Sequence, residues 1–242
     1  MHKKLILLFC LAVFFSGCQT TKNFQQTQNS GFLINSPSHS DVKIVKVDLT
    51  NPNLKIVTNP KSKKMFFPKA FAKSSGSEIV INTTPFKKDG SLTGLAIDNK
   101  KIISNPVETY CALCFFKKTD GWKAEIIDAQ SEIDDLEKKY GTLPDIAAGG
   151  FWTILRNQEI YSFKDIKNYR TAAGICDNGK TLILLSAKNM SYMDCARIFL
   201  DEGAEAAMQF DGGRSAQLVI NGKNQVRAFG RRKVPAVLGF IQ

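Results

Sequence analysis

The stretch Phe210-Asp211-Gly212-Gly213-Arg214-Ser215-Ala216-Gln217-Leu218 places an acid and two glycines between apolar segments. A glycine pair lets backbone N–H groups approach a ligand closely, while a carboxylate, a guanidinium and a hydroxyl group project from the same turn. Asp-Gly is also a common signal for a tight turn between two strands. The stretch therefore predicts either a polar binding site or a simple hairpin turn.

The segments around this stretch carry the alternating or β-branched pattern of strands. Residues 206–210 are expected to form a strand that ends at Asp211, and residues 78–81 a buried strand that ends at Asn82. Residues 42–49 are expected to pair with residues 54–58, and residues 146–154 to form a strand bulged at its glycine pair. Hairpins are expected at residues 92–103, 111–127, 171–186 and 217–229.

Three helices are expected between these strands. Pro68 at a first helical position and Gly76 as a stop bound a short helix, and Ser131 is the expected N-cap of a helix over residues 131–140 that ends at Gly141. Ser191 and Asp194 form a capping box that opens a third helix, which stops at Gly203. Hairpins with a few helices predict a single α+β domain with a mixed, largely antiparallel sheet; a doubly wound parallel fold is the second choice.

Five short motifs occur in a fixed order along the chain. They are Asp48-Leu49-Thr50-Asn51-Pro52-Asn53-Leu54, Ile81-Asn82 with Phe86 close behind, Gly149-Gly150, Arg170-Thr171-Ala172-Ala173-Gly174 and Asp211-Gly212-Gly213-x-Ser215. Their order and spacing resemble the phosphodiester glycosidase family, which includes the mannose 6-phosphate uncovering enzyme. The resemblance runs from residue 42 to the end and includes Arg232-Lys233-Val234-Pro235, which leads into a final strand. The chain departs from the family pattern at Arg214 and at Thr83-Thr84-Pro85-Phe86.

The resemblance implies a domain over residues 41–242 that cleaves a glycosidic bond to phosphate. Asp211 is the expected catalytic carboxylate, and Arg170 is expected to hold the phosphate, because an arginine fork matches two phosphate oxygens. The expected substrate-binding residues are Asn82, Gly149, Gly150, Thr171, Gly212, Gly213, Arg214 and Ser215. Phe151 or Trp152 can offer a stacking face to a sugar.

Glycosidases usually use two carboxyl groups, and the second one is left open. Asp48 and Glu205 are the alternatives, although turn formation and a helix end also explain them. A phosphate leaving group is a weak base, so Asp211 alone can suffice. Ser215 is expected to bind rather than to act as nucleophile, and no cofactor is assigned beyond a divalent cation that Asp211 can bind.

The first residues carry an export signal. Lys3 and Lys4 precede an apolar segment too short to span a bilayer, and Ser16-Gly17-Cys18 is a lipoprotein cleavage site. We therefore expect a signal peptide over residues 1–17, lipidation of Cys18 and a flexible tether over residues 18–40. Gln19 after the cysteine indicates an outer-membrane lipoprotein of a bacterial envelope; a plain signal peptide cut elsewhere is the alternative.

Composition narrows the chemistry further. The net charge of +11 favours anionic partners, and export disfavours nucleic acid among them. The two histidines, His2 and His39, lie in or beside the N-terminal segments, so a histidine-based triad or zinc site is disfavoured. The four remaining cysteines predict either a disulfide or buried thiols: Cys111, Cys114, Cys176 and Cys195.

The sequence thus predicts an exported lipoprotein that hydrolyses the glycosidic bond of a sugar-1-phosphate diester in an envelope or host glycan. A non-catalytic module that binds a phosphorylated or acidic polysaccharide is the main alternative. A phosphodiesterase that cuts the P–O bond is a third class, which differs only in its products.

Overall fold

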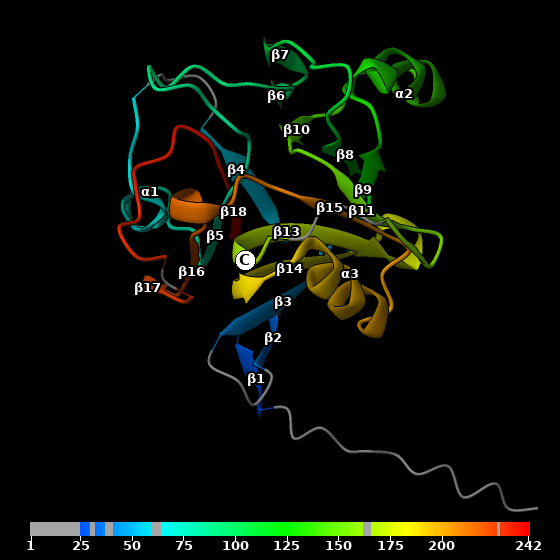
Figure 1. The fold of residues 1–242 in the computed structure, drawn as a ribbon. Coiled ribbons are helices and arrows are strands. Elements are labelled where there is room, and N and C mark those ends of the chain that lie inside the picture. Colours follow the sequence, from blue (N-terminus) through cyan, green and yellow to red (C-terminus); the bar gives the residue numbers. More distant parts are fainter. Residues whose placement is uncertain (1–24, 30–31, 37–40, 60–63, 162–165, 227) are drawn as a thin grey trace, which may run out of the picture.

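The computed structural model describes residues 25–29, 32–36, 41–59, 64–161, 166–226 and 228–242 (Figure 1). Its strands form three sheets, and every strand pairing within these residues is antiparallel. The predicted α+β class with a largely antiparallel sheet is confirmed, and the doubly wound parallel alternative is wrong. The signal peptide, Cys18 and His39 lie outside the described residues.

The first sheet has eight strands and runs through the middle of the molecule. In spatial order it contains β1 (Gln25–Asn29), β2 (Phe32–Ser36), β3 (Val42–Asp48), β14 (Thr181–Met190), β13 (Asn168–Cys176), β15 (Ala206–Gln209), β11 (Thr153–Arg156) and β12 (Glu159–Ile160). β1 and β2 fall within the predicted tether, and the Phe32 side chain is 1% exposed. A flexible tether as far as residue 40 is therefore too long, because residues 25–29 and 32–36 belong to the sheet.

Two five-stranded sheets complete the fold. The second sheet contains β7 (Lys101–Ser104), β6 (Ala96–Asp98), β10 (Ile146–Gly149), β8 (Ala112–Lys118) and β9 (Gly121–Ile127). The third sheet contains β17 (Lys223–Asn224), β16 (Leu218–Ile220), β5 (Ile79–Asn82), β18 (Val237–Ile241) and β4 (Lys55–Thr58). The largest hydrophobic cluster draws side chains from all three sheets, including Phe115, Phe210 and Phe240, which are each buried.

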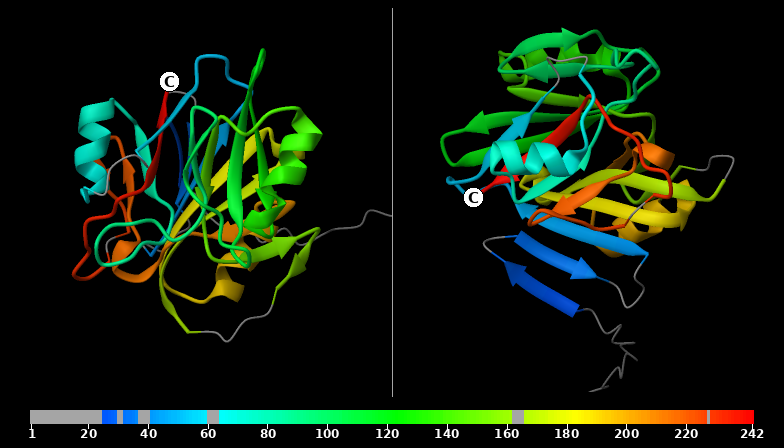
Figure 2. Two further views of the ribbon diagram at one scale, coloured as in Figure 1. Left: turned by 90° about the horizontal axis from the view of Figure 1, so that it is seen from above. Right: turned by 90° about the vertical axis from the view of Figure 1, so that its left-hand side faces the viewer.

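Each helix covers a smaller cluster. α1 (Pro68–Ser75) packs on the third sheet, α2 (Ile133–Tyr140) on the second and α3 (Tyr192–Asp201) on the first, and Figure 2 shows α1 and α2 on opposite sides of the molecule. Pro68 begins α1 and left-handed Gly76 ends it, as predicted. The capping box of Ser191 and Asp194 is also present. No helix in the described part of the chain has the length and apolar character needed to cross a membrane.

Three local predictions were wrong. β4 does not pair with β3 but with β18 in another sheet. A 3-10 turn over Gln130–Glu132 precedes α2, so Ser131 is not its N-cap. The expected strand over residues 146–154 is two strands, β10 and β11, because the chain leaves the second sheet at Gly149 and enters the first at Thr153.

Candidate active site

The Asp211 segment crosses from the first sheet to the third. It leaves β15 after Gln209, passes through a 3-10 turn over Gly213–Ser215 and enters β16 at Leu218. The backbone N–H of Asp211 donates to the carbonyl of Thr83 over 2.9 Å, and the N–H of Phe210 donates to the carbonyl of Thr171 over 2.9 Å. The segment is therefore a fixed bridge between two sheets, and the alternative of a simple hairpin turn does not apply.

Asn82, at the end of β5, holds this bridge through hydrogen bonds. Its Nδ2 donates to the Asp211 carbonyl over 2.6 Å, and its Oδ1 accepts from the Gln217 N–H over 2.9 Å and from Thr171 Oγ1 over 3.1 Å. Thr171 Oγ1 also lies 3.0 Å from the Asp211 carbonyl. Both side chains are buried and their hydrogen bonds support the backbone of the Asp211 segment, while the direct substrate contact expected of them stays a prediction.

The Asp211 carboxylate faces Arg232 and Ser215. Its Oδ2 lies 3.3 Å from Nη2 of Arg232, whose Nε donates to Ser215 Oγ over 2.8 Å. Burial raises the pKa of the Asp211 carboxyl above its ordinary value, while the hydrogen bond from Ser215, the charge of Arg232 and the Gly212 N–H oppose that rise. A carboxyl group whose pKa is shifted by burial and by a specific charged partner is typical of a functional site.

Arg232 was not among the predicted site residues. Its guanidinium stacks on the ring of Phe86 at 4.4 Å from the centroid, and the Arg232 side chain is 45% exposed, so part of it is accessible to solvent. The sequence shows Arg232 only within the basic group Arg231-Arg232-Lys233, a pattern that is typical of a solvated surface. Phe86 belonged to a motif that we recognised, but no spacing connects it with Arg232.

Arg170 lies near Gly212 and is buried. Its Nε donates to the carbonyl of Met190 over 3.1 Å, its Nη2 donates to the carbonyl of Ile166, and its guanidinium stacks on Tyr192 at 3.9 Å. A methyl group added at Gly212 would lie 3.8 Å from Nη1. Arg170 therefore lies against the backbone of the predicted site, while Arg232 holds its carboxylate.

The glycines serve close packing. The N–H groups of Gly149 and Gly150 donate to the carbonyls of Leu95 and Cys111, and a methyl group on Gly150 would lie 2.4 Å from the carbonyl oxygen of Gln209. The Gly149 and Gly150 N–H groups are thus engaged inside the protein and do not cradle a ligand.

The two glycines of the Asp211 segment are required for different reasons. A methyl group on Gly212 would lie 2.9 Å from the carbonyl oxygen of Tyr169, and Gly213 has a φ of 59°. Next to them, exposed Arg214 donates from Nε to the carbonyl of Gly230 over 2.6 Å. Arg214 thereby holds the loop that carries Arg232 beside Asp211.

The two candidates for a second carboxyl group lie elsewhere. Asp48 accepts from the N–H and Oγ1 of Thr50, and Glu205 accepts from the N–H of Asn178. Glu205 precedes β15 and Asp211 follows it, which separates them by roughly 20 Å at about 3.3 Å per residue. Both acids hold turns at the far end of the first sheet.

The aromatic residues and cysteines that the sequence analysis singled out are also placed by the structure. Phe151 and Trp152 stack on each other at 5.8 Å and are partly exposed. The four cysteines are buried free thiols, the second of the two predicted alternatives. Within the described residues, no group of three or more His, Cys, Asp or Glu side chains could hold a metal ion.

Comparison with known proteins assigns the chain to a family. The model of the phosphodiester glycosidase family matches residues 75–241, which include Asn82, Arg170, Asp211 and Arg232. The chain belongs to the phosphodiester glycosidase family. The resemblance inferred from the five motifs is confirmed.

Solved structures share the fold of this phosphodiester glycosidase domain at low identity. The catalytic domain of zebrafish N-acetylglucosamine-1-phosphodiester alpha-N-acetylglucosaminidase, auto-inhibited by its pro-peptide, is 18% identical with a TM-score of 0.64; the match covers 91% of this chain and 82% of that one. A hypothetical protein from Synechocystis is 13% identical with a TM-score of 0.65, over 90% of this chain and 61% of that one. The comparison with curated proteins gave no match.

Proposed function

We propose that this phosphodiester glycosidase domain hydrolyses the glycosidic bond of a sugar-1-phosphate diester. The observation that carries the proposal is the contact of a buried carboxyl group, Asp211, with a half-exposed guanidinium, Arg232, and the Ser215 hydroxyl. The substrate offers an anion for the guanidinium and an anomeric carbon for the carboxyl group. The family and the site are consistent with this substrate class.

Arg232 is the proposed phosphate-binding residue. Cleavage between the anomeric carbon and oxygen turns a diester with one negative charge into a monoester with more charge. The attraction of a guanidinium fork grows with that charge, so binding strengthens from substrate to products. Stacking on Phe86 and the hydrogen bond to Ser215 fix the plane of the fork in advance.

Asp211 is the proposed catalytic carboxylate at the sugar. It takes a proton from water as that water attacks the anomeric carbon, or it attacks the carbon itself and is then released by water. The phosphate monoester leaves as a weak base and needs no acid group, which suits a site where neither Asp48 nor Glu205 is near. Asn82 and Thr171 hold the Asp211 backbone in the required place.

The test uses purified protein and a methyl diester of N-acetylglucosamine-1-phosphate in oxygen-18 water. The proposal expects label in the sugar, whereas cleavage of the P–O bond would place it in the phosphate. Asp211→Asn should lower kcat by about a hundredfold or more, in the range of a lost acid–base group. Turnover that neither Asp211→Asn nor Arg232→Ala reduces would refute the site.

A non-catalytic binding module is the second candidate. The observation in its favour is that a single carboxyl group faces Arg232, where glycosidases usually carry two. Binding of phosphorylated glycans with no turnover across a panel of sugar phosphodiesters would support it over the hydrolase.

We also propose that the domain is exported and anchored by Cys18 to the outer membrane of a bacterial envelope. The lipoprotein signal over residues 1–18 and the net charge of +11, suited to an anionic envelope glycan, support this location. Mass spectrometry of the mature N-terminus should find a lipid on Cys18. A mature chain that begins elsewhere, or partitions into the aqueous phase of a detergent extract, would refute the anchor.

A further inference from the structure

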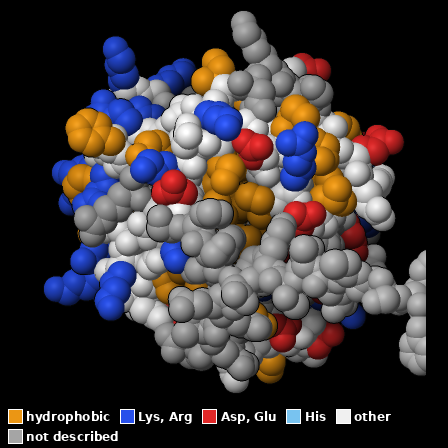
Figure 3. Space-filling model, turned by 60° about the horizontal axis from the view of Figure 1, so that its bottom comes forward, with side chains coloured by type: hydrophobic (Ala, Val, Ile, Leu, Met, Phe, Trp, Pro, Cys, Tyr) orange, Lys and Arg blue, Asp and Glu red, His pale blue; other side chains and the backbone are white. Residues whose placement is uncertain are grey.

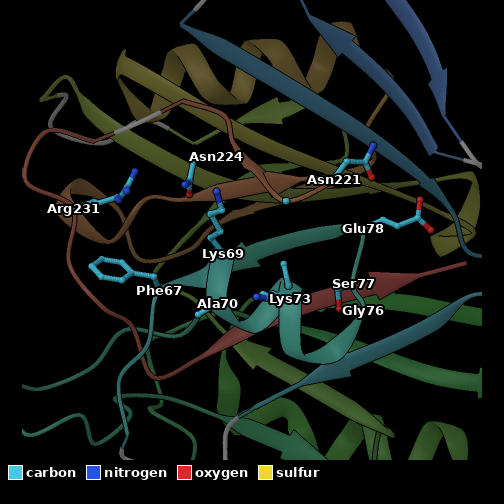
Figure 4. A pocket seen from close by; sticks show the side chains of 12 residues that line it. Phe67, Lys69, Ala70, Lys73, Gly76, Ser77, Glu78, Asn221, Asn224 and Arg231 are labelled. Carbon is cyan, nitrogen blue, oxygen red and sulfur yellow. The ribbon is translucent and has the colours of Figure 1, made fainter.

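Two cavities lie side by side next to the candidate site. The first, of about 650 Å³, lies between α1 and the β16–β17 turn, and Figure 4 shows Phe67 and Arg231 at one end of it and Glu78 at the other. The second, of about 510 Å³, lies under the loop at residues 228–231 and reaches Tyr169. Phe67 and Arg231 line both cavities, so the two cavities adjoin, and together they are called the groove below.

The groove leads to the Asp211 segment. Tyr169 lies in the second cavity, and its carbonyl oxygen lies 2.9 Å from the position of a methyl group on Gly212. Gly230, in the same cavity, accepts the hydrogen bond from Arg214. The second cavity is thus lined by residues that contact the neighbours of Asp211 in the chain.

Positive charges follow this path. Arg232 contacts Asp211, its N–H donates to the Arg214 carbonyl over 2.9 Å, and Arg231 lies between the two cavities. Lys69 and Lys73 on α1 continue the row into the first cavity, and both are exposed. No acidic group among the described residues pairs with either lysine. Figure 3 shows the same concentration of Lys and Arg along the side of the molecule that holds α1.

Aromatic side chains line the same cavities as these charges. Phe67 is 38% exposed and lies 5.7 Å below the Arg231 guanidinium, and Phe229 is 91% exposed at the second cavity. Both rings line the second cavity, so a ligand bound there can contact them. A groove lined by both cations and rings suits a chain of phosphates and sugars, since sugars stack on aromatic faces and phosphates pair with cations.

We propose that this groove binds the body of a polyanionic glycan with repeating sugar phosphates, whose terminal diester is presented to Asp211. A polymer is therefore the preferred substrate, because a short sugar phosphodiester reaches Asp211 without the contacts that the groove offers. This inference rests on the proposed function for the reaction at Asp211, while the groove itself is defined by Phe67, Lys69, Lys73 and Arg231.

The test compares two substrates with the same scissile bond. One is the methyl diester of N-acetylglucosamine-1-phosphate, and the other is an oligomer of the same sugar joined through 1-phosphodiesters. Lys69→Ala combined with Lys73→Ala should lower kcat/KM for the oligomer about tenfold, the scale of two exposed ion pairs, and leave the methyl diester unchanged. The control pair, Lys101→Ala with Lys180→Ala, removes two exposed lysines outside the groove and should change neither.

Binding is measured separately in Asp211→Asn protein with a fluorescent oligomer. The two groove substitutions should raise its Kd about tenfold, and the control pair should not. If the oligomer binds through Lys69 and Lys73 but neither substrate is turned over, the groove stands and the proposed reaction fails. If both substrates are turned over and the substitutions affect them equally, the reaction stands and the groove is refuted.

A lipid surface is the competing source of phosphate. Vesicles of phosphatidylglycerol and phosphatidylcholine form a second arm of the binding test. Loss of vesicle binding in the groove variant with unchanged oligomer binding, or an oligomer that binds no form of the protein, overturns the proposal.

Discussion

Replacing Asn82 with alanine tests whether this residue holds the site or touches the substrate. The substitution removes three hydrogen bonds from a side chain that is 1% exposed. Each is worth about 1 kcal/mol net, and the buried N–H of Gln217 left without a partner adds about 1–3 kcal/mol. The expected loss is about 4 kcal/mol of the free energy of unfolding, a large share of the ~5–15 kcal/mol typical of a domain.

Urea unfolding and thermal melting measure this loss. A loss of about 4 kcal/mol should lower Tm by about 10 °C in a domain of this size. Asn53→Ala is the control: it lies at an exposed turn where the Asn53 backbone N–H donates to Asn51 Oδ1, so the substitution keeps this bond and should stay within about 0.5 kcal/mol. Asn82→Asp sharpens the test, because the new carboxylate would face the Asp211 carbonyl 2.6 Å away unless protonated. The folded-state pKa of the new carboxyl group should therefore be raised, so this variant should gain stability as pH falls toward the pKa of an aspartate in the unfolded chain.

Kinetics separate the two roles of Asn82. A positioning residue should lower kcat more than it raises KM, because Asp211 moves while the phosphate contact at Arg232 remains. A fully stable Asn82→Ala protein whose only change is a higher KM would refute our reasoning and restore Asn82 as a substrate contact.

Three further predictions concern the site and its supports. Asp211→Asn should lower kcat about a hundredfold or more, yet should equal or exceed the wild type in stability at pH 7. Burial raises the pKa of Asp211 in the folded state, so the stabilising contribution of this carboxyl group is complete below its unfolded pKa and is lost as pH rises through its folded pKa. Urea unfolding from pH 3.5 to 7 checks this, and a wild type that gains stability over the variant as pH rises contradicts it. Arg232→Lys should lower kcat/KM about 10- to 100-fold with little effect on Tm, since an ammonium cannot hold Ser215 and Asp211 together; Arg231→Lys, measured on the methyl diester, is the control. Gly150→Ala should cost about 2–3 kcal/mol in urea unfolding, because its methyl group would lie 2.4 Å from a carbonyl oxygen, and a loss under about 0.5 kcal/mol would show that the backbone can move aside.

Local signals in the sequence were sufficient for much of the fold. The capping box at Ser191 and Asp194, the left-handed stop at Gly76 and the hairpin turns each depend on a few adjacent residues, so their patterns predict them directly. The pairing of β4 with β18 was not predicted, because its partner lies about 180 residues away and no local signal records it.

The same limit explains why the sequence pointed to Arg170 and not to Arg232, the arginine that contacts the Asp211 carboxylate. Arg170 stood in a recognisable motif at the start of a strand, but its donors bind the carbonyls of Met190 and Ile166. Arg232 reaches Asp211 only because its loop is held from two sides: Phe66 bridges to Val234, and Arg214 accepts from the Arg232 N–H. These contacts are long-range, so a run of basic residues in the sequence gave no sign of them.

The position of the site between two sheets explains why its polar residues divide into two groups. A chain that leaves the first sheet at Gln209 and joins the third at Leu218 has backbone groups that neither sheet can pair. Asn82 and Thr171 supply those partners, which is why they are buried and surround the Asp211 carbonyl. With the backbone satisfied from inside, the Asp211 carboxyl is free to face Arg232 at the protein surface. A substitution in the inner group should therefore act first on folding, and one at Asp211 or Arg232 on the reaction.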